Sequence, residues 1–171
     1  MFLYFIKRAL AYWIDCLVAF STVMLVFQWA ILSQFRDLIG ITDEWFKDSI
    51  NMHLYVLLTI SIPVLLYFAY FDTKHAKGTF GKRLFKLEVK SVSDHQISLG
   101  RSFLRTFLKL LPWEIAHIGV IYPEPVYFQQ NANIHFVTYI GLFIFLVYVV
   151  GILVSSKRQT LYDRVVNTHV V

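Results

Sequence analysis

Cysteine is almost absent from this sequence, which contains only Cys16. One cysteine excludes an intrachain disulfide and a cysteine-based metal cluster. Charged residues are also scarce, at 16% of the chain against about 25% in soluble domains. Hydrophobic residues reach 57%, more than a soluble fold of 171 residues can bury. These absences argue against a soluble domain and favour a chain whose apolar surface faces lipid.

Catalytic and nucleotide-binding motifs are missing too. The sequence has no Gly-x-Ser-x-Gly nucleophile turn and no His-Glu-x-x-His zinc motif. Residues 78–82, Gly-Thr-Phe-Gly-Lys, lack the spacing of a phosphate loop and are followed by Arg83 where such a loop has Ser or Thr. We therefore do not expect an enzyme. The formal net charge of +5 comes from basic residues at the ends of apolar runs, so we expect no nucleic-acid partner.

Long apolar runs are what the sequence does contain. About 20 apolar residues cross a bilayer as a helix, and three runs meet or approach that length: 9–32, 54–71 and 136–154. The first exceeds the ~7–15 residues of a signal-peptide core and lacks a cleavage site, so we interpret it as a retained span. A fourth segment, 103–121, has four polar interruptions: Arg105, Lys109, Glu114 and His117.

Loop charge predicts the topology, because Lys and Arg accumulate on the cytoplasmic side. Residues 72–101 contain seven Lys or Arg and the tail from 155 contains three. Residues 36–48 have two basic against four acidic residues, and 122–135 have no Lys or Arg. The prediction is a cytoplasmic N-terminus, loop 72–101 and C-terminus. Both termini lie on one side only if the number of crossings is even, so 103–121 should cross, bent near Pro112.

The cytoplasmic loop 72–101 carries a short strand pattern. Residues 84–92 alternate in polarity with a period of two, and a turn at 93–95 precedes 96–99. We predict a β-hairpin. The fold expected is therefore an all-α membrane protein, a four-helix transmembrane bundle in one domain (1–171) with a small cytoplasmic β-hairpin insertion.

Three patches follow one another along the chain: 8–15 (Arg-Ala-Leu-Ala-Tyr-Trp-Ile-Asp), 78–82, and 158–164 (Arg-Gln-Thr-Leu-Tyr-Asp-Arg) with the tail 167–171. In this order they resemble the RDD family of bacterial membrane proteins, named for one Arg and two Asp. The resemblance covers nearly the whole chain. It implies that Arg8, Asp15 and Asp163 are the family's named residues. It also implies a location in the membrane and, more loosely, transport of unidentified ligands or sodium/proton exchange.

Asp15 lies about two turns inside the first span, where a charge is expensive and normally has a partner. Arg8 is on the same helix face but roughly 10 Å away along the axis. We therefore expect Asp15 to pair with a basic residue of another segment, one of Arg101, Arg105, Lys109 and Arg164. The pair would either fix helix packing or take part in ion or proton passage.

Glu114 and His117 are spaced i, i+3, so they share a helix face. Bundle metal sites and proton relays use this spacing, and so does a simple Glu–His hydrogen bond near the outer interface. A divalent metal would need further ligands, from Asp15, His53, His135 or another subunit.

Arg101, Arg105 and Lys109 follow at i, i+4 and i+8 and predict a cationic stripe on an amphipathic helix. The stripe would contact anionic lipid headgroups or set the depth of the helix by snorkelling.

Our leading functional hypothesis is a small multi-pass protein of the bacterial cytoplasmic membrane that is a transporter or transport-associated. It would move a cation, a proton or a small polar ligand through a polar centre, and would form an oligomer. That centre comprises Arg8, Asp15, Glu114, His117 and Asp163. The alternatives are a non-catalytic partner that docks another membrane protein or anionic lipid, and a metal-dependent membrane enzyme using Glu114 and His117.

Overall fold

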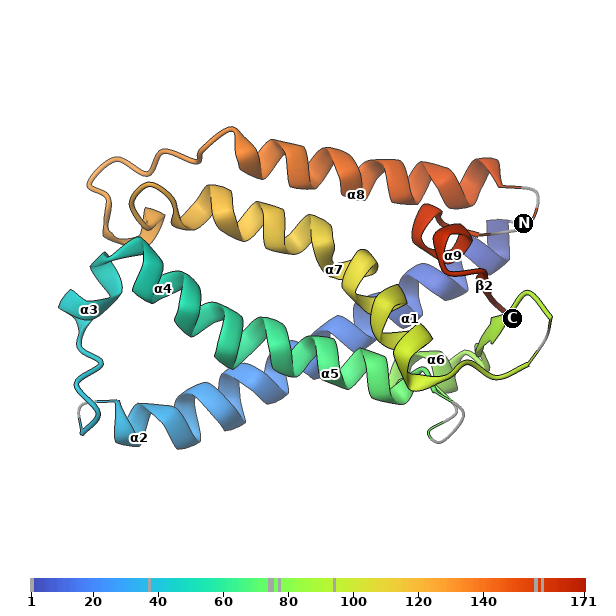
Figure 1. Ribbon diagram of the computed structural model, residues 1–171, viewed down its shortest axis with the longest axis horizontal. Helices are drawn as coiled ribbons and strands as arrows, with labels where there is room; N and C mark the ends of the chain where they lie inside the picture. Colours follow the sequence, from blue (N-terminus) through green and yellow to red (C-terminus); the bar gives the residue numbers. More distant parts are fainter. Residues whose placement is uncertain are drawn as a thin grey trace. The chain divides into compact units, whose positions relative to one another are not determined.

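The computed structural model describes residues 2–36, 38–73, 76, 78–93, 95–155, 157 and 159–171 (Figure 1). Its contacts divide the chain into two units. Unit 1 comprises Met1–Phe20, Leu65–Leu110 and Phe145–Val171. Unit 2 comprises Ser21–Val64 and Leu111–Ile144. Each unit is described by itself below.

Three helical segments are long and apolar enough to cross a membrane, and they match the runs predicted from the sequence. The first, Leu3–Phe35, combines α1 (Phe2–Ser21), η1 (Thr22–Leu32) and α2 (Ser33–Phe35). The second, Ser49–Phe71, combines α4 (Ser49–Val56), η2 (Leu57–Ser61) and α5 (Ile62–Phe71). The third is α8 (Val137–Val154), with a mean hydropathy of 2.6. Few of their residues are buried within the protein, as expected for helices whose solvent is lipid.

Two of these segments contain π-helical turns, η1 and η2. Pro63 follows η2 by two residues. Proline has no N–H, and in a regular α-helix its ring clashes with the carbonyl four residues earlier, here that of Thr59. We attribute the wider turns of η2 to this proline. Within unit 2, Gln28 of η1 donates to the Thr59 hydroxyl and accepts from the Tyr55 hydroxyl, which satisfies these polar groups inside apolar segments.

The fourth predicted segment is the helix α7 (Leu99–Ile121), which continues through Pro112. Its charged residues exclude it from the helices apolar enough to span, so three spans are identified by composition where four were predicted. In unit 2, Gly141 of α8 lies so close to α7 that a Cβ atom would fall 2.5 Å from the Pro112 carbonyl oxygen. A glycine is therefore needed at this helix contact.

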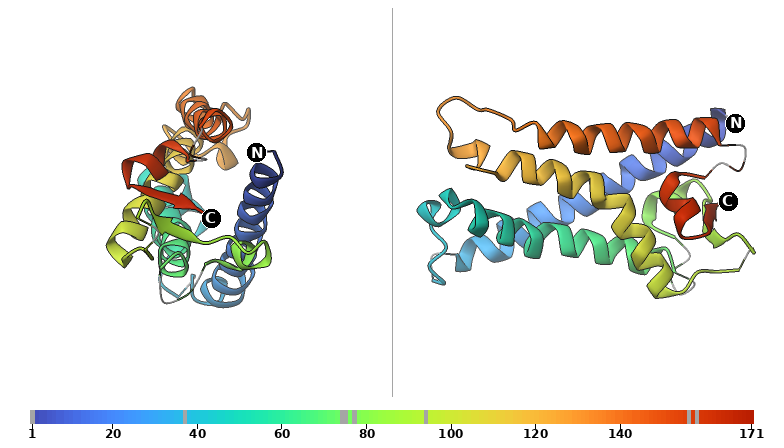
Figure 2. Two further views of the ribbon diagram at one scale, coloured as in Figure 1. Left: turned by 90° about the vertical axis from the view of Figure 1, so that its right-hand side faces the viewer. Right: turned by 45° about the horizontal axis from the view of Figure 1, so that its top comes forward.

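The predicted cytoplasmic hairpin is wrong in its partner strand. β1 (Val89–Ser91) pairs antiparallel with β2 (Thr168–Val170) at the chain's end, with Lys90 opposite His169 (Figure 2). Of the predicted pairing with 96–99, one isolated bridge between Lys90 and Gln96 is present. Asp94, in the predicted turn, lies outside the described residues. Val170 of the C-terminal strand and Ile97 of the predicted partner segment both join one buried apolar cluster; the other members are Ala11, Leu87 and Val89.

Two short helices complete unit 1: α6 (Phe80–Leu84) after the second apolar segment, and α9 (Leu161–Val165) just before β2. In unit 2, Thr42 is the N-cap of α3 (Asp43–Lys47), and its hydroxyl accepts from the Trp45 N–H. η3 (Val126–Phe128) follows α7. The Ser49 hydroxyl donates to the Pro123 carbonyl, which links the two connections of this unit.

Candidate functional site: a buried charged cluster in unit 1

The three sequence patches that resemble the RDD family all contribute to unit 1, where seven charged side chains are buried. They are Arg8, Asp15, Asp72, Lys82, Arg105, Lys109 and Asp163, none more than 8% exposed. Charged side chains are rarely buried without partners. We call this set the charged cluster, and its hydrogen bonds account for most of the charges.

Asp163 is positioned by the start of α9. Thr160 is the N-cap: its hydroxyl accepts from the Asp163 N–H, and Asp163 Oδ2 accepts from the Thr160 N–H, each at 3.2 Å. This capping box leaves carboxylate lone pairs for two arginines. Arg8 of α1 donates to Oδ2, and Arg105 of α7 donates to Oδ1 from Nε at 2.9 Å and from Nη2 at 2.8 Å. Asp163 thereby ties both ends of the chain to α7.

Asp72 follows α5 directly and accepts from two cations. Lys82 of α6 donates to Oδ1, and Arg105 Nη1 donates to Oδ2 at 3.0 Å. Arg105 thus joins both carboxylates, and the contacts form one chain: Arg8, Asp163, Arg105, Asp72, Lys82. A guanidinium suits this role because its planar fork presents several donors in fixed directions.

The ionised state of both carboxyls follows from these contacts. Burial by itself would raise the pKa of Asp163, but the charges of Arg105 and Arg8 and their hydrogen bonds outweigh it and hold the pKa well below its usual range. For Asp72, burial is outweighed by Lys82, Arg105 and Lys109, so its pKa is also lowered. Both are therefore carboxylates at neutral pH.

Asp15 has different partners from those predicted. Its Oδ1 accepts from the Gly81 N–H at 2.7 Å, and Oδ2 accepts from the Thr79 hydroxyl. Among the described residues no basic side chain forms an ion pair with Asp15, so the predicted pairing with Arg101, Arg105, Lys109 or Arg164 is wrong. A backbone N–H and a hydroxyl already satisfy the carboxylate, and Arg105 is paired with other carboxylates.

Gly81 permits this contact. A Cβ atom at Gly81 would lie 2.2 Å from the Ala11 carbonyl oxygen and 3.1 Å from Asp15 Cγ, so any larger residue would force α6 away from α1. Gly78, earlier in the same patch, has a φ of 104°, in the region that side chains rarely adopt. The pattern Gly-Thr-Phe-Gly-Lys is thus a turn and helix start fitted against Asp15, with Lys82 directed to Asp72.

Lys109 stands apart from the ion pairs. Its Nζ lies 3.3 Å from the centroid of the Phe68 ring and 5.1 Å from that of Tyr12. Aromatic faces attract cations through their quadrupole, most strongly where water is excluded. No described carboxylate forms a salt bridge with Lys109.

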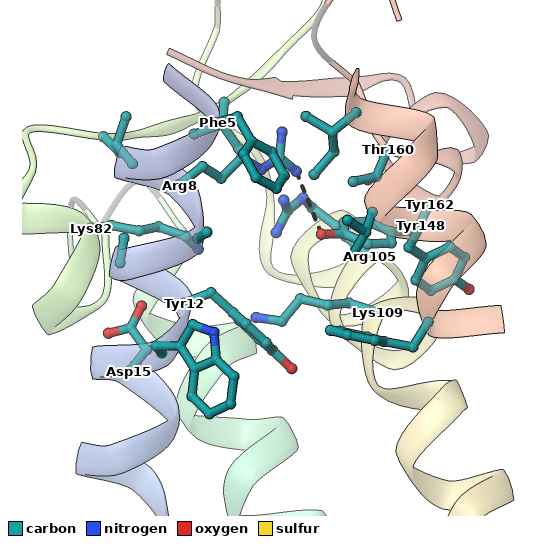
Figure 3. Close-up of a pocket in the computed structure, with 18 residues that line it drawn as sticks. Phe5, Arg8, Tyr12, Asp15, Lys82, Arg105, Lys109, Tyr148, Thr160 and Tyr162 are labelled. Carbon is teal, nitrogen blue, oxygen red and sulfur yellow. Dashed lines mark hydrogen bonds between the residues drawn. The ribbon is translucent and has the colours of Figure 1, made fainter. Parts of the chain in front are cut away.

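A cavity of about 310 Å³ opens beside the charged cluster (Figure 3). Arg8, Arg105 and Lys109 border it together with Tyr12, Tyr148 and Tyr162. Apolar side chains of α1 and α8 form much of the remaining wall. Figure 3 shows Arg8 and Lys82 reaching in from one side, with Lys109 extending from the opposite side toward Tyr12. The cavity is therefore lined by both cationic and apolar side chains.

Two of the three basic residues in the stripe predicted on α7 are buried instead of exposed on the helix surface. Arg101 is exposed, but Arg105 is 1% exposed and Lys109 is 7% exposed. The spacing does place them on one helix face. That face is buried because Asp72 and Asp163, distant in sequence, supply partners for Arg105, and aromatic rings cover Lys109.

Glu114 and His117 belong to unit 2, whereas Arg8, Asp15 and Asp163 belong to unit 1. His117 Nδ1 lies 3.7 Å from Glu114 Oε1, and both side chains are about one-third exposed. In the part of the chain that the structure describes, no three His, Cys, Asp or Glu side chains are grouped so as to hold a metal ion. A metal bound here with ligands from another subunit stays a prediction.

The site also contains residues that we did not single out from the sequence, chiefly Asp72, Thr79 and Lys82. Asp72 had a usable signal, since it ends an apolar run in front of a basic loop. Thr79 and Lys82 lie inside the Gly-Thr-Phe-Gly-Lys patch. Arg158, the first residue of the third patch, lies outside the described residues.

Comparison with known proteins identifies the family of this chain. The model of the RDD family matches residues 4–167, which is nearly the whole chain. No curated protein and no solved structure matches the sequence or the structure of this chain. The residues that carried the resemblance are in contact in unit 1: Arg8 with Asp163, and Asp15 with the Gly-Thr-Phe-Gly-Lys patch. The chain therefore belongs to the RDD family.

Proposed function

We propose that this protein is a multi-pass protein of the bacterial cytoplasmic membrane that transports an ion or small polar ligand, or assists such transport. One observation carries the proposal: among the described residues seven charged side chains of unit 1 are buried, and five of these residues line a cavity, in a protein with three helices apolar enough to span a bilayer. Buried charge in a membrane protein is costly and commonly marks a ligand or ion path.

The proposed orientation has the N-terminus, loop 72–101 and the C-terminus in the cytoplasm. All three belong to unit 1, and the Tyr4 hydroxyl donates to the Val170 carbonyl at 2.8 Å, so the two ends of the chain meet. The connections poor in Lys and Arg, 36–48 and 122–135, both belong to unit 2. This division supports an even number of crossings, with α7 as the fourth.

Ion pairs alone would serve helix packing, and replacing such pairs by apolar residues is often neutral or stabilising. The cavity and Lys109 favour a ligand-handling role in addition. Four buried cations face three carboxylates here, and each of Asp72 and Asp163 is already shared by two cations. The cavity is therefore poorly suited to a free metal cation and better suited to a polar or anionic ligand. A homo-oligomer would complete the path.

The test is reconstitution into vesicles that enclose a pH-sensitive dye, with flux followed after imposed proton, sodium or organic-anion gradients. The variant is Lys109→Gln, which removes a buried cation that forms no salt bridge with a described carboxylate. Exposed Lys86→Gln is the matched control. We expect flux that falls in Lys109→Gln and persists in Lys86→Gln.

Folded wild-type protein that moves none of these solutes would contradict a transport role by itself. A stable co-purifying membrane protein would then favour the second candidate, a non-catalytic docking partner. That candidate rests on basic residues of loop 72–101 that lie outside the charged cluster, such as the exposed Lys86 and Arg101, which suit anionic lipid headgroups.

A further inference from the structure

We infer that the cavity of unit 1 binds an amphiphile with one anionic head, a carboxylate or a phosphate, and an acyl chain, with Lys109 as the residue that contacts the head. The inference rests on the proposed function, because it names the ligand class of the same site. It starts from Lys109, which among the described residues is a buried cation outside the chain of ion pairs.

The charge balance supports an anionic ligand. Arg8, Arg105 and Lys82 share the carboxylates Asp72 and Asp163. The oxygens of Asp15 accept from a backbone N–H and a hydroxyl. Lys109 is buried among aromatic rings, and no described carboxylate forms a salt bridge with it. The charge of Asp72 acts on Lys109, but the oxygens of Asp72 already accept from Lys82 and Arg105. A buried cation without an ion pair is costly, and an anion entering the cavity would relieve that cost.

The apolar part of the cavity lining supports the acyl chain. It includes Phe5 and Ala9 of α1 and Phe145, Val149 and Ile152 of α8. Such a surface has no donors or acceptors for a small polar solute, but it matches methylene groups. Its volume of about 310 Å³ lies at the lower end of the ~300–1,000 Å³ common for small-molecule sites. That space accommodates a head and one chain segment, so a second acyl chain of the same ligand would remain outside the cavity.

The location fits the same ligand. Arg8 lies near the N-terminal end of the first span and Ile152 near the C-terminal end of the third, the ends proposed to face the cytoplasm. Anionic lipids give this leaflet its negative surface potential. In the proposed orientation this cavity, which is lined by cationic and apolar side chains, would be accessible to anions of the membrane itself.

Trp13 provides the probe, because it borders the cavity and is the one tryptophan of unit 1. The protein is purified in a nonionic detergent after Trp29, Trp45 and Trp113 are replaced by Phe. Quenching of Trp13 is then titrated with a dibrominated fatty acid, with its uncharged methyl ester and with brominated phosphatidylglycerol. Inorganic phosphate is used as a competitor.

We expect Lys109→Gln to weaken binding of the fatty acid about tenfold or more, since a charge-assisted contact is lost, and to leave the methyl ester unchanged. Lys109→Arg should retain binding, and the exposed-site control Lys86→Gln should match wild type. Val149→Phe, which leaves every charge in place, should weaken binding of both acyl ligands by filling the cavity. If Lys109→Gln fails to fold, Val149→Phe still tests whether the ligand occupies the cavity. The fatty acid compared with its methyl ester, in wild type and in Lys109→Arg, still tests the anionic head.

Equal binding of acid and methyl ester would overturn the anionic head. Full displacement by inorganic phosphate at similar concentration would overturn the acyl chain. Stronger quenching by the fatty acid or by phosphatidylglycerol identifies the source of the head, and both agree with the inference. Binding without flux supports the amphiphile site and contradicts the transport role. Flux without binding supports the transport role and contradicts the amphiphile site.

Discussion

Replacing Asp163 with Asn removes one negative charge from a site where two arginines converge. Asp163 is fully buried and the Arg8 side chain is only 10% exposed, so water cannot compensate the loss. The amide oxygen of Asn can still accept from the Thr160 N–H, and the α9 cap should survive. What is lost is the ionic part of two arginine contacts. Breaking one side of a buried pair typically destabilises by about 3–5 kcal/mol, and we expect a loss in that range.

A double-mutant cycle separates the pair from its surroundings. Asp163→Asn, Arg8→Gln and the double variant are unfolded at equilibrium in mixed micelles, and the coupling free energy is taken from the four stabilities. We expect about 1.5–3 kcal/mol, as for hydrogen bonds to charged groups. The control cycle is the exposed pair Lys47–Glu44, whose side chains are 52% and 78% exposed, with an expected coupling of about 0.5 kcal/mol or less.

A coupling between Arg8 and Asp163 no larger than that of the control pair would refute the contact on which the site is built. Asp163→Ala extends the same test, because it removes the cap acceptor as well. Its additional loss should be about 1 kcal/mol, the usual contribution of an N-terminal cap. Additional loss far above that value would mean that the cap, rather than the ion pairs, positions α9.

Three further predictions concern the packing, the pH response and the strand pairing of unit 1. Gly81→Ala should destabilise the protein by about 2 kcal/mol or more, since its Cβ would lie 2.2 Å from the Ala11 carbonyl oxygen; a thermal midpoint equal to wild type would contradict the α1–α6 contact. The lowered pKa of Asp163 adds stability that is fully present above its ordinary value near ~3.9 and is lost as the pH falls further, through the folded-state pKa. Below pH 5 the free energy of unfolding should therefore fall steeply with decreasing pH in wild type and less steeply in the Asp163→Asn variant. In a cysteine-free background, cysteines at Lys90 and His169 should be joined by a short thiol cross-linker, because the two residues are opposed in β1 and β2; absence of the product in folded protein would argue against this register.

The apolar segments were predictable because a lipid-facing helix needs a long run of apolar residues whatever its neighbours are. The runs 9–32, 54–71 and 136–154 correspond to helices that the structure identifies as able to span. The membership of Arg8, Asp15 and Asp163 in one site was also accessible through the resemblance of three patches. Their individual partners were not, since each carboxylate had several basic residues within reach of a plausible fold.

Burial was where pattern reasoning failed. Arg105 and Lys109 recur at helical spacing beside an exposed Arg101, and the spacing alone predicts a solvated stripe. The strand 89–91 likewise had an adjacent candidate partner in 96–99, but it pairs with a strand nearly 80 residues further along the chain. In both cases the deciding contacts come from segments remote in sequence.

The sequence by itself determined that this chain enters a membrane, where its helices run and which loops carry positive charge, because these follow from local transfer free energies. Only the tertiary structure decided which buried charges form ion pairs and that, among the described residues, Lys109 forms none. Ion pairing depends on where carboxylates such as Asp72 and Asp163 meet in space, and that meeting leaves Lys109 facing a cavity between aromatic rings.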